Sequence, residues 1–193
     1  MEIIRDNVNK AEVVSAWLTR EYNSRKDFKE SIQKNAPDTI PYIFKTDFDN
    51  AQSNACRWKA LTSSTRGGYA EPVFSRISVW KIARLTLLEL GELKAVESES
   101  WHIMSNGSFK FKDIAYGLIT NPKLRDNEPT RESANCIMDN AEKLTEAREL
   151  PIAIGSLSAL TVMEGVHRIS GTLVYYNGCS DLKAKDIFVG IKI

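Results

Sequence analysis

Apolar residues in the first half of the chain recur mainly at helical spacing. Between residues 8 and 32 they include Val8, Trp17, Phe28 and Ile32, which predicts a mostly helical stretch over residues 1–35. A denser apolar pattern over Ile77–Leu93 predicts a long buried helix. The segment Glu99–Met104 is read as a strand and Ser105–Gly107 as a tight turn. Phe109 then begins another extended or helical run, and an extended run would complete a hairpin.

The second half carries clearer signals. Thr130 is placed as the N-cap of a helix over Arg131–Arg148. The short apolar runs Leu150–Ile154 and Leu160–Met163 predict two strands. After Gly165 comes a helical pattern, and Gly178 stands where a C-terminal glycine is expected. The β-branched segment Leu182–Ile193 predicts a closing strand. The apolar positions of the helix after Gly165 are Val166, Ile169, Leu173 and Tyr176.

Breaks in these patterns divide the chain. Pro37 and Pro41 end the first helical stretch, and Tyr42–Phe44 is read as a short strand. The segment Thr62–Gly68 (TSSTRGG) has the composition of a loop. The order of elements predicts an α+β fold, with a mainly helical region over residues 1–95 and a second domain over residues 96–193.

Composition narrows the classes of protein. The 193 residues are 42% hydrophobic, enough for a packed core, and the formal net charge of +1 argues against coating nucleic acid by charge alone. No run approaches the roughly 18 apolar residues of a membrane span, and no signal peptide is recognised. Three widely spaced cysteines and two histidines argue against a disulfide framework or a histidine-rich metal centre. We therefore expect a cytoplasmic protein with no membrane partner.

The segment around Gly165 contains the residues that are the best candidates for a binding or catalytic site. A strand that enters a helix through a glycine directs the first free backbone N–H groups beyond the strand end, where the helix dipole favours phosphate. His167 and Arg168 in the first helical turn add a titratable group and a fixed cation. Glu164 at the strand end is placed to act on water, a hydroxyl or a metal.

The residues Glu164-Gly165-Val166-His167-Arg168, between a strand and a helix, resemble the G-x-H-R signature of the ParB/sulfiredoxin superfamily. This resemblance implies a small mixed sheet with packed helices. It implies that Gly165, Val166, His167 and Arg168 hold nucleotide phosphates, with Arg131 and Ser133 contributing from the helix before the Pro-Ile strand. It also implies a catalytic set of Glu164, His167 and Arg168, with ATP or another nucleotide as ligand and Mg²⁺ accompanying it near Glu164.

The chain departs from two branches of the superfamily. Sulfiredoxins carry a reactive cysteine immediately before the His-Arg pair, where Val166 stands here, which argues against sulfinic-acid reduction. Partition proteins continue into a helix-turn-helix, whereas this sequence ends about fifteen residues after the motif helix. A stand-alone member comparable to a plasmid fertility-inhibition protein fits the arrangement better.

Two functions follow from the resemblance. The first is a nucleotide-hydrolysing or phosphotransfer enzyme, with a nuclease acting on DNA as its variant. The second is a non-catalytic interaction protein encoded by a phage or plasmid, which would contact a host or plasmid protein through the polar, Trp-containing segment 50–69. A third interpretation gives the motif residues no role beyond starting a surface helix.

Overall fold

The computed structural model of this protein describes residues 1–156, 158–177 and 184–191. The chain forms two compact units. The first, here called the helical unit, comprises Arg5–Lys81 with the end of the last strand from Gly190. The second, called the sheet unit, comprises Met1–Ile4 and Ile82–Val189. Within the described residues, no helix is both long and apolar enough to cross a membrane.

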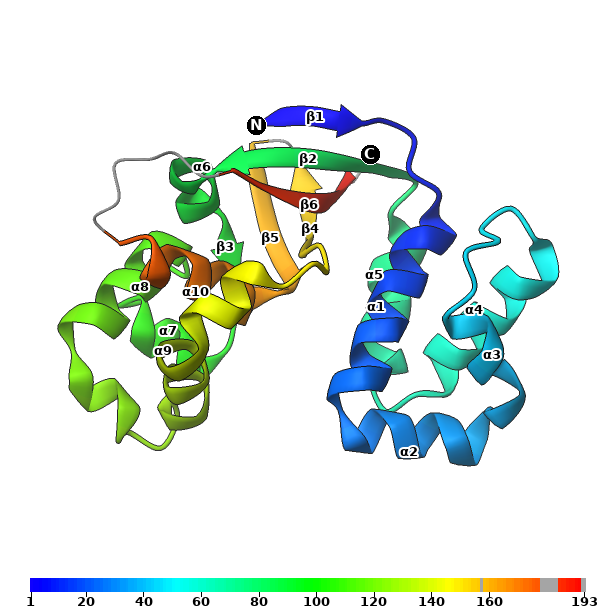
Figure 1. The fold of residues 1–193 in the computed structure, drawn as a ribbon, viewed down its shortest axis with the longest axis horizontal. Coiled ribbons are helices and arrows are strands. Elements are labelled where there is room, and N and C mark those ends of the chain that lie inside the picture. Colours follow the sequence, from blue (N-terminus) through cyan, green and yellow to red (C-terminus); the bar gives the residue numbers. More distant parts are fainter. Residues whose placement is uncertain (157, 178–183, 192–193) are drawn as a thin grey trace. The chain divides into compact units, whose positions relative to one another are not determined.

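Among its described residues, the helical unit contains five α-helices, which Figure 1 labels α1 to α5. The side chains of Asn9 and Asn50 cap two of them by accepting hydrogen bonds from the backbone N–H groups of Ala11 and Ser53, each at 2.9 Å. In the core, the ring of Trp17 meets the rings of Phe28 and Phe74 edge-on, at 5.6 and 6.1 Å. The helices are α1 (Lys10–Ser24), α2 (Lys26–Asn35), α3 (Ile40–Ile43), α4 (Ala51–Ser63) and α5 (Gly67–Arg76), with a 3₁₀ turn at Pro37–Thr39.

Over residues 1–156, 158–177 and 184–191, the sheet has six strands in the order β1-β2-β6-β4-β5-β3. Strands β4 and β5 form an antiparallel hairpin, while β3 runs parallel to β5 with Lys94 opposite Thr161. The sheet is therefore mixed. The strands are β1 (Glu2–Arg5), β2 (Val79–Thr86), β3 (Lys94–Ala95), β4 (Ile152–Ser156), β5 (Ala159–Glu164) and β6 (Ala184–Ile191).

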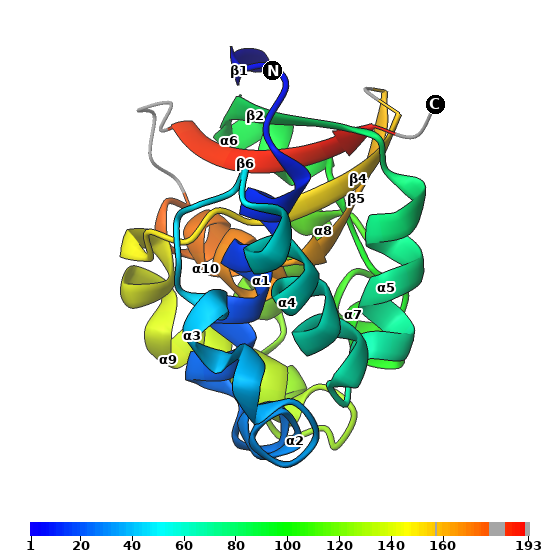
Figure 2. The ribbon, with the colours of Figure 1, turned by 90° about the vertical axis from the view of Figure 1, so that its right-hand side faces the viewer.

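The described part of the sheet unit also contains five α-helices. Figures 1 and 2 show α8, α9 and α10 gathered below it. Gly171 of α10 lies against α9, because a Cβ at this position would come within 2.9 Å of the Leu144 side chain. The close approach explains why a glycine stands in the middle of this helix. The helices are α6 (Leu87–Glu92), α7 (Glu99–Met104), α8 (Phe111–Thr120), α9 (Arg131–Glu146) and α10 (Val166–Tyr175).

The predicted α+β class is confirmed, and so are the elements of the second half: a helix from Arg131, the two strands, the helix from Val166 and the final strand. Helices also fill most of residues 1–35, although residues 2–5 form a strand that the pattern did not indicate. Thr130 stands at the predicted N-cap position of α9, but its side chain does not cap the helix, because its hydroxyl donates to the carbonyl of Leu124 at 2.5 Å. Gly178 and parts of the closing segment lie outside the described residues.

The long helix predicted over Ile77–Leu93 is wrong. The segment forms β2 and then α6. Trp80, Ala83 and Leu85 are buried, and this set is compatible with both a helix and a strand in a short apolar segment. The strand ends at Thr86, because the hydroxyl of Thr86 and the carboxylate of Glu89 form a reciprocal capping box that starts a helix at Leu87.

Three further predictions are corrected. Glu99–Met104 is a helix rather than a strand, because Ser98 caps it; residues 106–107 turn as expected but lead into helix α8. Tyr42–Phe44 is no strand, since α3 ends at Ile43. In the segment Thr62–Gly68, residues 64–66 form the expected loop, but Thr62 and Ser63 belong to α4 and Gly67 and Gly68 to α5. Within segment 50–69, Arg57 is 1% exposed, so this residue does not present its charge to a partner.

The carboxylate of Glu92 joins α6 to the start of α8. It accepts hydrogen bonds from the ammonium groups of Lys110 at 2.7 Å and Lys112 at 2.6 Å. These bonds lower the pKa of Glu92 from 4.5 to about 2. A carboxyl group whose pKa is depressed by folding stabilises the fold above its unfolded pKa and loses that contribution as the pH falls.

We therefore expect Glu92→Gln to lower the melting temperature slightly at pH 6, and the difference from the parent to shrink below pH 4.5 and vanish near pH 2. Melting curves of the parent and the variant at pH 6, 4 and 3 measure this difference in melting temperature. The control is Glu97→Gln, because Glu97 is exposed and has no ion-pair or hydrogen-bond partner among the described residues. A constant difference for Glu92→Gln across this range would contradict the pKa assignment.

Candidate functional site

The strand-to-helix turn after β5 has the form that the sequence predicts. Strand β5 ends at Glu164, Gly165 adopts φ +92°, and α10 begins at Val166. A Cβ on Gly165 would lie 2.8 Å from the Cβ of Pro151 and 2.9 Å from Nη2 of Arg168. Both the left-handed backbone and the lack of space therefore require glycine here.

The backbone N–H groups that open α10 have no partner within the helix. The first bond of its i→i−4 series runs from the N–H of Ile169 to the carbonyl of Gly165, at 3.0 Å. The N–H groups of Val166, His167 and Arg168 precede it. The N-cap residue, Gly165, has no side chain with which to cap these N–H groups, and the first turn contains no acidic residue. This end of α10 is a potential anion-binding site.

The guanidinium of Arg168 lies beneath the turn and is 3% exposed. Its Nη2 is 3.6 Å from Oε1 of Glu164, and its Nη1 is 4.0 Å from Oε2 of Glu149. Both separations are too long for hydrogen bonds. Nε and Nη2 have no hydrogen-bond partner among the described residues. A buried cation with unused donors is costly to maintain, which points to a ligand that supplies the missing acceptors.

Burial lowers the pKa of Arg168 to about 10, and the nearby charge of Glu149 acts in the opposite direction. Arg168 therefore keeps its positive charge at neutral pH.

His167 faces the other helix. Its Nε2 lies 3.2 Å from the hydroxyl oxygen of Ser133 in the first turn of α9, and its ring meets that of Trp101 edge-on at 5.2 Å. The first turns of α9 and α10 thus lie side by side. Their amino ends carry partial positive charge near Ser133 and His167, and Glu132 in the first turn of α9 offsets part of it.

Arg131 is exposed and turned toward the loop before α9. Its Nη1 pairs with the carboxylate of Glu128 at 2.5 Å, and its Nη2 donates to the carbonyl of Asp126 at 2.9 Å. The predicted site residues therefore fall into three places: Ser133 with His167, Arg168 with Glu164 below Gly165, and Arg131 on the surface.

Two residues close to this site were not singled out from the sequence. Glu149 lies near Arg168 because the chain enters β4 beside the turn, and Trp101 reaches His167 from α7. Neither carries a local signal. An acidic residue two positions before a proline and a tryptophan in an apolar run are ordinary, and only the tertiary fold brings them to the motif.

A pocket of about 450 Å³ adjoins the Arg168 cluster. Lys185 lies in its wall and donates to the carbonyl of Thr145 at 2.9 Å. Burial lowers the pKa of Lys185, and the charge of Arg168 adds to this effect. Arg84 forms two hydrogen bonds with Asp186, at 2.8 and 3.1 Å. The lining residues are Arg84, Leu87, Thr145, Ala147, Glu149, Leu150, Thr172, Tyr176, Lys185 and Asp186.

Among the described residues, no group of three or more His, Cys, Asp or Glu side chains is arranged to hold a metal ion. Comparisons of the chain with protein-family models, with curated proteins and with solved structures found no match.

Proposed function

We propose that the chain binds the phosphate groups of a nucleotide at the amino-terminal end of α10 and catalyses phosphoryl transfer or hydrolysis there. The observation that carries the proposal is the Arg168 guanidinium, which is buried beside the first turn of α10 with two of its nitrogens lacking a hydrogen-bond partner among the described residues. A phosphate oxygen would supply the acceptor that this cation lacks. The resemblance to the ParB/sulfiredoxin superfamily supports the same ligand class.

Each motif residue has a role in this proposal. The N–H groups of Val166 to Arg168 bind phosphate oxygens, and Arg168 stabilises charge that develops on the transferred group. Glu164 orients the attacking water, whose oxygen forms the new bond to phosphorus as the bond to the leaving oxygen breaks. Ser133 fixes the orientation of the His167 ring through their 3.2 Å contact. A phosphodiester of DNA in the same position makes the site a nuclease.

Mg²⁺ would enter with the nucleotide, held mainly by its phosphates. Glu164 is the nearest predicted ligand, but its side chain is 11% exposed and is paired with Arg168. This residue is thus a weaker candidate for direct metal binding than for contact with Arg168 and the reacting group.

The same observation favours a second function, binding without catalysis. A carboxylate that is largely buried against a cation is not free to take a proton from water. In this alternative, Glu164 only positions Arg168, and the chain is an interaction protein that retains a nucleotide site.

The test is a thermal-shift panel of ATP, ADP, CTP and AMP, with and without Mg²⁺. We expect one nucleotide to stabilise the parent, by about 2.7 kcal/mol at a hundred times its Kd, and Arg168→Lys to remove most of this shift, because an ammonium lacks the planar fork of donors. The control is Arg148→Ala, which removes an exposed arginine from the chain segment just before Glu149. No stabilisation of the parent by any nucleotide would contradict the proposal.

Turnover separates the two functions. We expect Glu164→Gln to bind the nucleotide and to lose at least a hundredfold in hydrolysis if the residue orients water. Phosphate release by the parent and the variant at saturating nucleotide measures this. If the parent binds nucleotide but releases no phosphate, the non-catalytic alternative holds.

A further inference from the structure

Aromatic rings and cations alternate on one part of the helical unit. Phe44 is 45% exposed, and its ring meets that of Tyr22 edge-on at 5.6 Å. The Lys29 ammonium lies 5.5 Å from the centre of the Tyr22 ring, and the Lys45 ammonium lies 4.2 Å from that of Tyr42. The two clusters meet along the chain at Phe44 and Lys45, and their five residues are here called the aromatic-basic patch.

The cations of the patch are available to an external anion. Neither Lys29 nor Lys45 forms an ion pair with a described acidic residue, whereas nearby Lys26 and Lys59 pair with Glu30 and Asp38.

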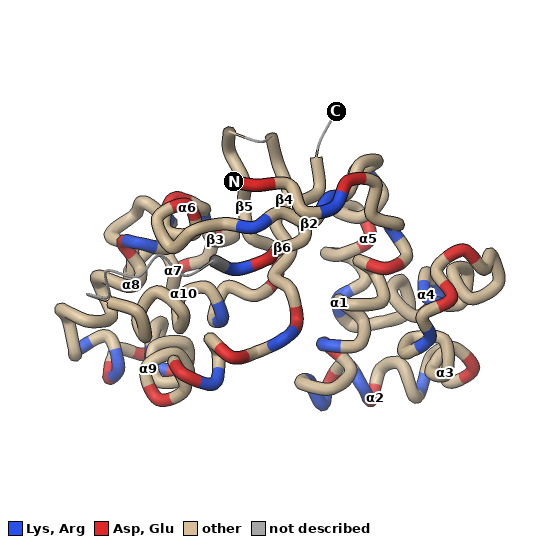
Figure 3. The backbone as a smooth tube through the Cα atoms, turned by 45° about the horizontal axis from the view of Figure 1, so that its top comes forward, with Lys and Arg blue, Asp and Glu red and all other residues tan. Residues whose placement is uncertain are grey.

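The charge of the surrounding unit has the same sign. Residues 5–81 contain thirteen Lys and Arg against nine Asp and Glu, a formal charge of +4. The rest of the chain contains thirteen Lys and Arg against sixteen Asp and Glu, a formal charge of −3. The overall charge of +1 therefore hides a basic helical unit, and Figure 3 shows the basic positions along α2. A basic surface raises the local concentration of polyanions.

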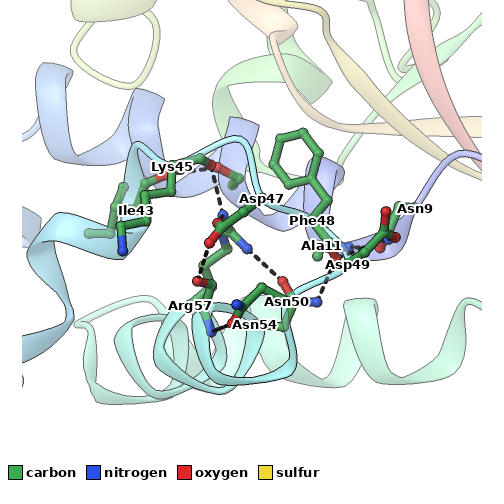
Figure 4. A network of polar contacts seen from close by, with 12 residues as sticks. Asn9, Ala11, Ile43, Lys45, Asp47, Phe48, Asp49, Asn50, Asn54 and Arg57 are labelled. Carbon is green, nitrogen blue, oxygen red and sulfur yellow. Dashed lines mark hydrogen bonds and ion pairs between the residues drawn. The ribbon is translucent and has the colours of Figure 1, made fainter.

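The segment that presents Phe44 and Lys45 is held rigidly. The hydroxyl of Ser15 donates to the carbonyl of Ile43 at 2.7 Å. Nη2 of Arg57 donates to the carbonyl of Lys45 at 2.7 Å and to Oδ1 of Asp47 at 2.9 Å (Figure 4). Because the segment is already ordered, a ligand that stacks on Phe44 would pay little conformational entropy.

We propose that the aromatic-basic patch binds single-stranded nucleic acid. Phe44 is exposed, and Tyr22 and Tyr42 are half-buried, each beside a lysine. Aromatic rings interleaved with cations are what such a ligand requires, because bases stack on the rings and phosphates meet the ammonium groups. Bases inside a duplex are already stacked on one another and cannot use Phe44 in this way. An apolar protein partner would gain nothing from Lys29 and Lys45, which distinguishes the two classes of partner. The proposal is independent of the site at α10.

The experiment measures fluorescence anisotropy of a labelled twenty-nucleotide oligo-dT with the full-length protein, over a series of salt concentrations. We expect Phe44→Ala to weaken binding about tenfold by removing one stacked base, with the salt dependence unchanged. The double variant Lys29→Glu/Lys45→Glu should weaken binding and also reduce the salt slope by at least 1, because two phosphate contacts are lost. Duplex DNA of the same length should bind more weakly.

The matched controls lie in the sheet unit. Tyr116 is 70% exposed and Lys123 is also exposed, so Tyr116→Ala and Lys123→Glu repeat the same chemical changes away from the patch. We expect both to bind like the parent. Far-ultraviolet circular dichroism confirms that each variant is folded.

Three results would overturn the proposal: no binding of oligo-dT by the parent, equal binding by the parent and the patch variants, or equal losses in the controls. Nucleotide stabilisation that depends on Arg168 is unaffected by any of these results, so failure here and failure at α10 are distinguishable.

Discussion

Arg57→Ala is expected to lower the free energy of unfolding of the helical unit by about 3 kcal/mol or more. The side chain is 1% exposed and forms hydrogen bonds with Asn54, Asp47 and the carbonyl of Lys45. Alanine leaves a cavity and deprives these groups of their donor. Urea unfolding followed by tryptophan fluorescence measures the loss.

Lys59→Ala is the matched control for this prediction. Lys59 lies on the same helix and pairs with Asp38 at 2.9 Å, the distance at which Arg57 pairs with Asp47, but both partners are more than half exposed. Surface ion pairs contribute about 0–1 kcal/mol, so a small change is expected. Similar losses in the two variants would show that burial of Arg57 contributes little. Because Arg57 anchors the segment that carries Phe44, its replacement should also weaken oligo-dT binding.

Gly165→Ala is expected to destabilise the sheet unit by about 3 kcal/mol. An alanine at φ +92° is strained by roughly 1–3 kcal/mol, and its Cβ would press on Pro151 and on the Arg168 guanidinium. The displaced Arg168 should also lose its position below the turn. We therefore expect the variant to lose nucleotide stabilisation even where it remains folded. Urea unfolding and the nucleotide panel measure the two effects.

Gly68→Ala is the comparison for this change. Gly68 lies in helix α5, and a Cβ there would meet no atom within 4 Å. Alanine at this position should be neutral or stabilising by up to about 1 kcal/mol, because it restricts the unfolded chain and favours the helix. If Gly165→Ala behaved like Gly68→Ala, the turn would not have the strained geometry described above.

The sequence predicted the second half of the chain better than the first for a physical reason. Around Gly165 each signal is local, because short β-branched runs, a glycine turn and a helical apolar stripe all agree. In Val79–Thr86, by contrast, the buried positions Trp80, Ala83 and Leu85 suit a helix as well as a strand. Pairing with neighbouring strands determines whether such a segment forms a strand or a helix, and this pairing cannot be predicted from the residues of the segment alone.

In the candidate site, too, the features that depend on consecutive residues were predictable and those that depend on tertiary packing were not. The order Glu164, Gly165, helix was predictable, since it depends on five consecutive residues. The contact of His167 with Ser133, thirty-four positions earlier, follows from how α9 packs on α10. The position of Glu149 beside Arg168 likewise depends on where β4 begins. The exposure of single side chains could not be predicted from the sequence either. Arg57 and Lys59 are both basic residues of the same segment, yet only the side chain of Lys59 reaches solvent.

The packing of α9 beside α10 places like poles of two dipoles together, an arrangement that repels unless opposite charge is supplied at each end. At the carboxyl end of α9, Lys185 supplies it by donating to the carbonyl of Thr145. At the amino end, α10 has no acidic residue in its first turn. Helix α9 is thus compensated at both ends, by Glu132 in its first turn and by Lys185 at its carboxyl end, whereas the first turn of α10 supplies no opposite charge. An anion at the amino end of α10 would tighten the two helices against each other, so occupancy should be readable as slower amide exchange along both.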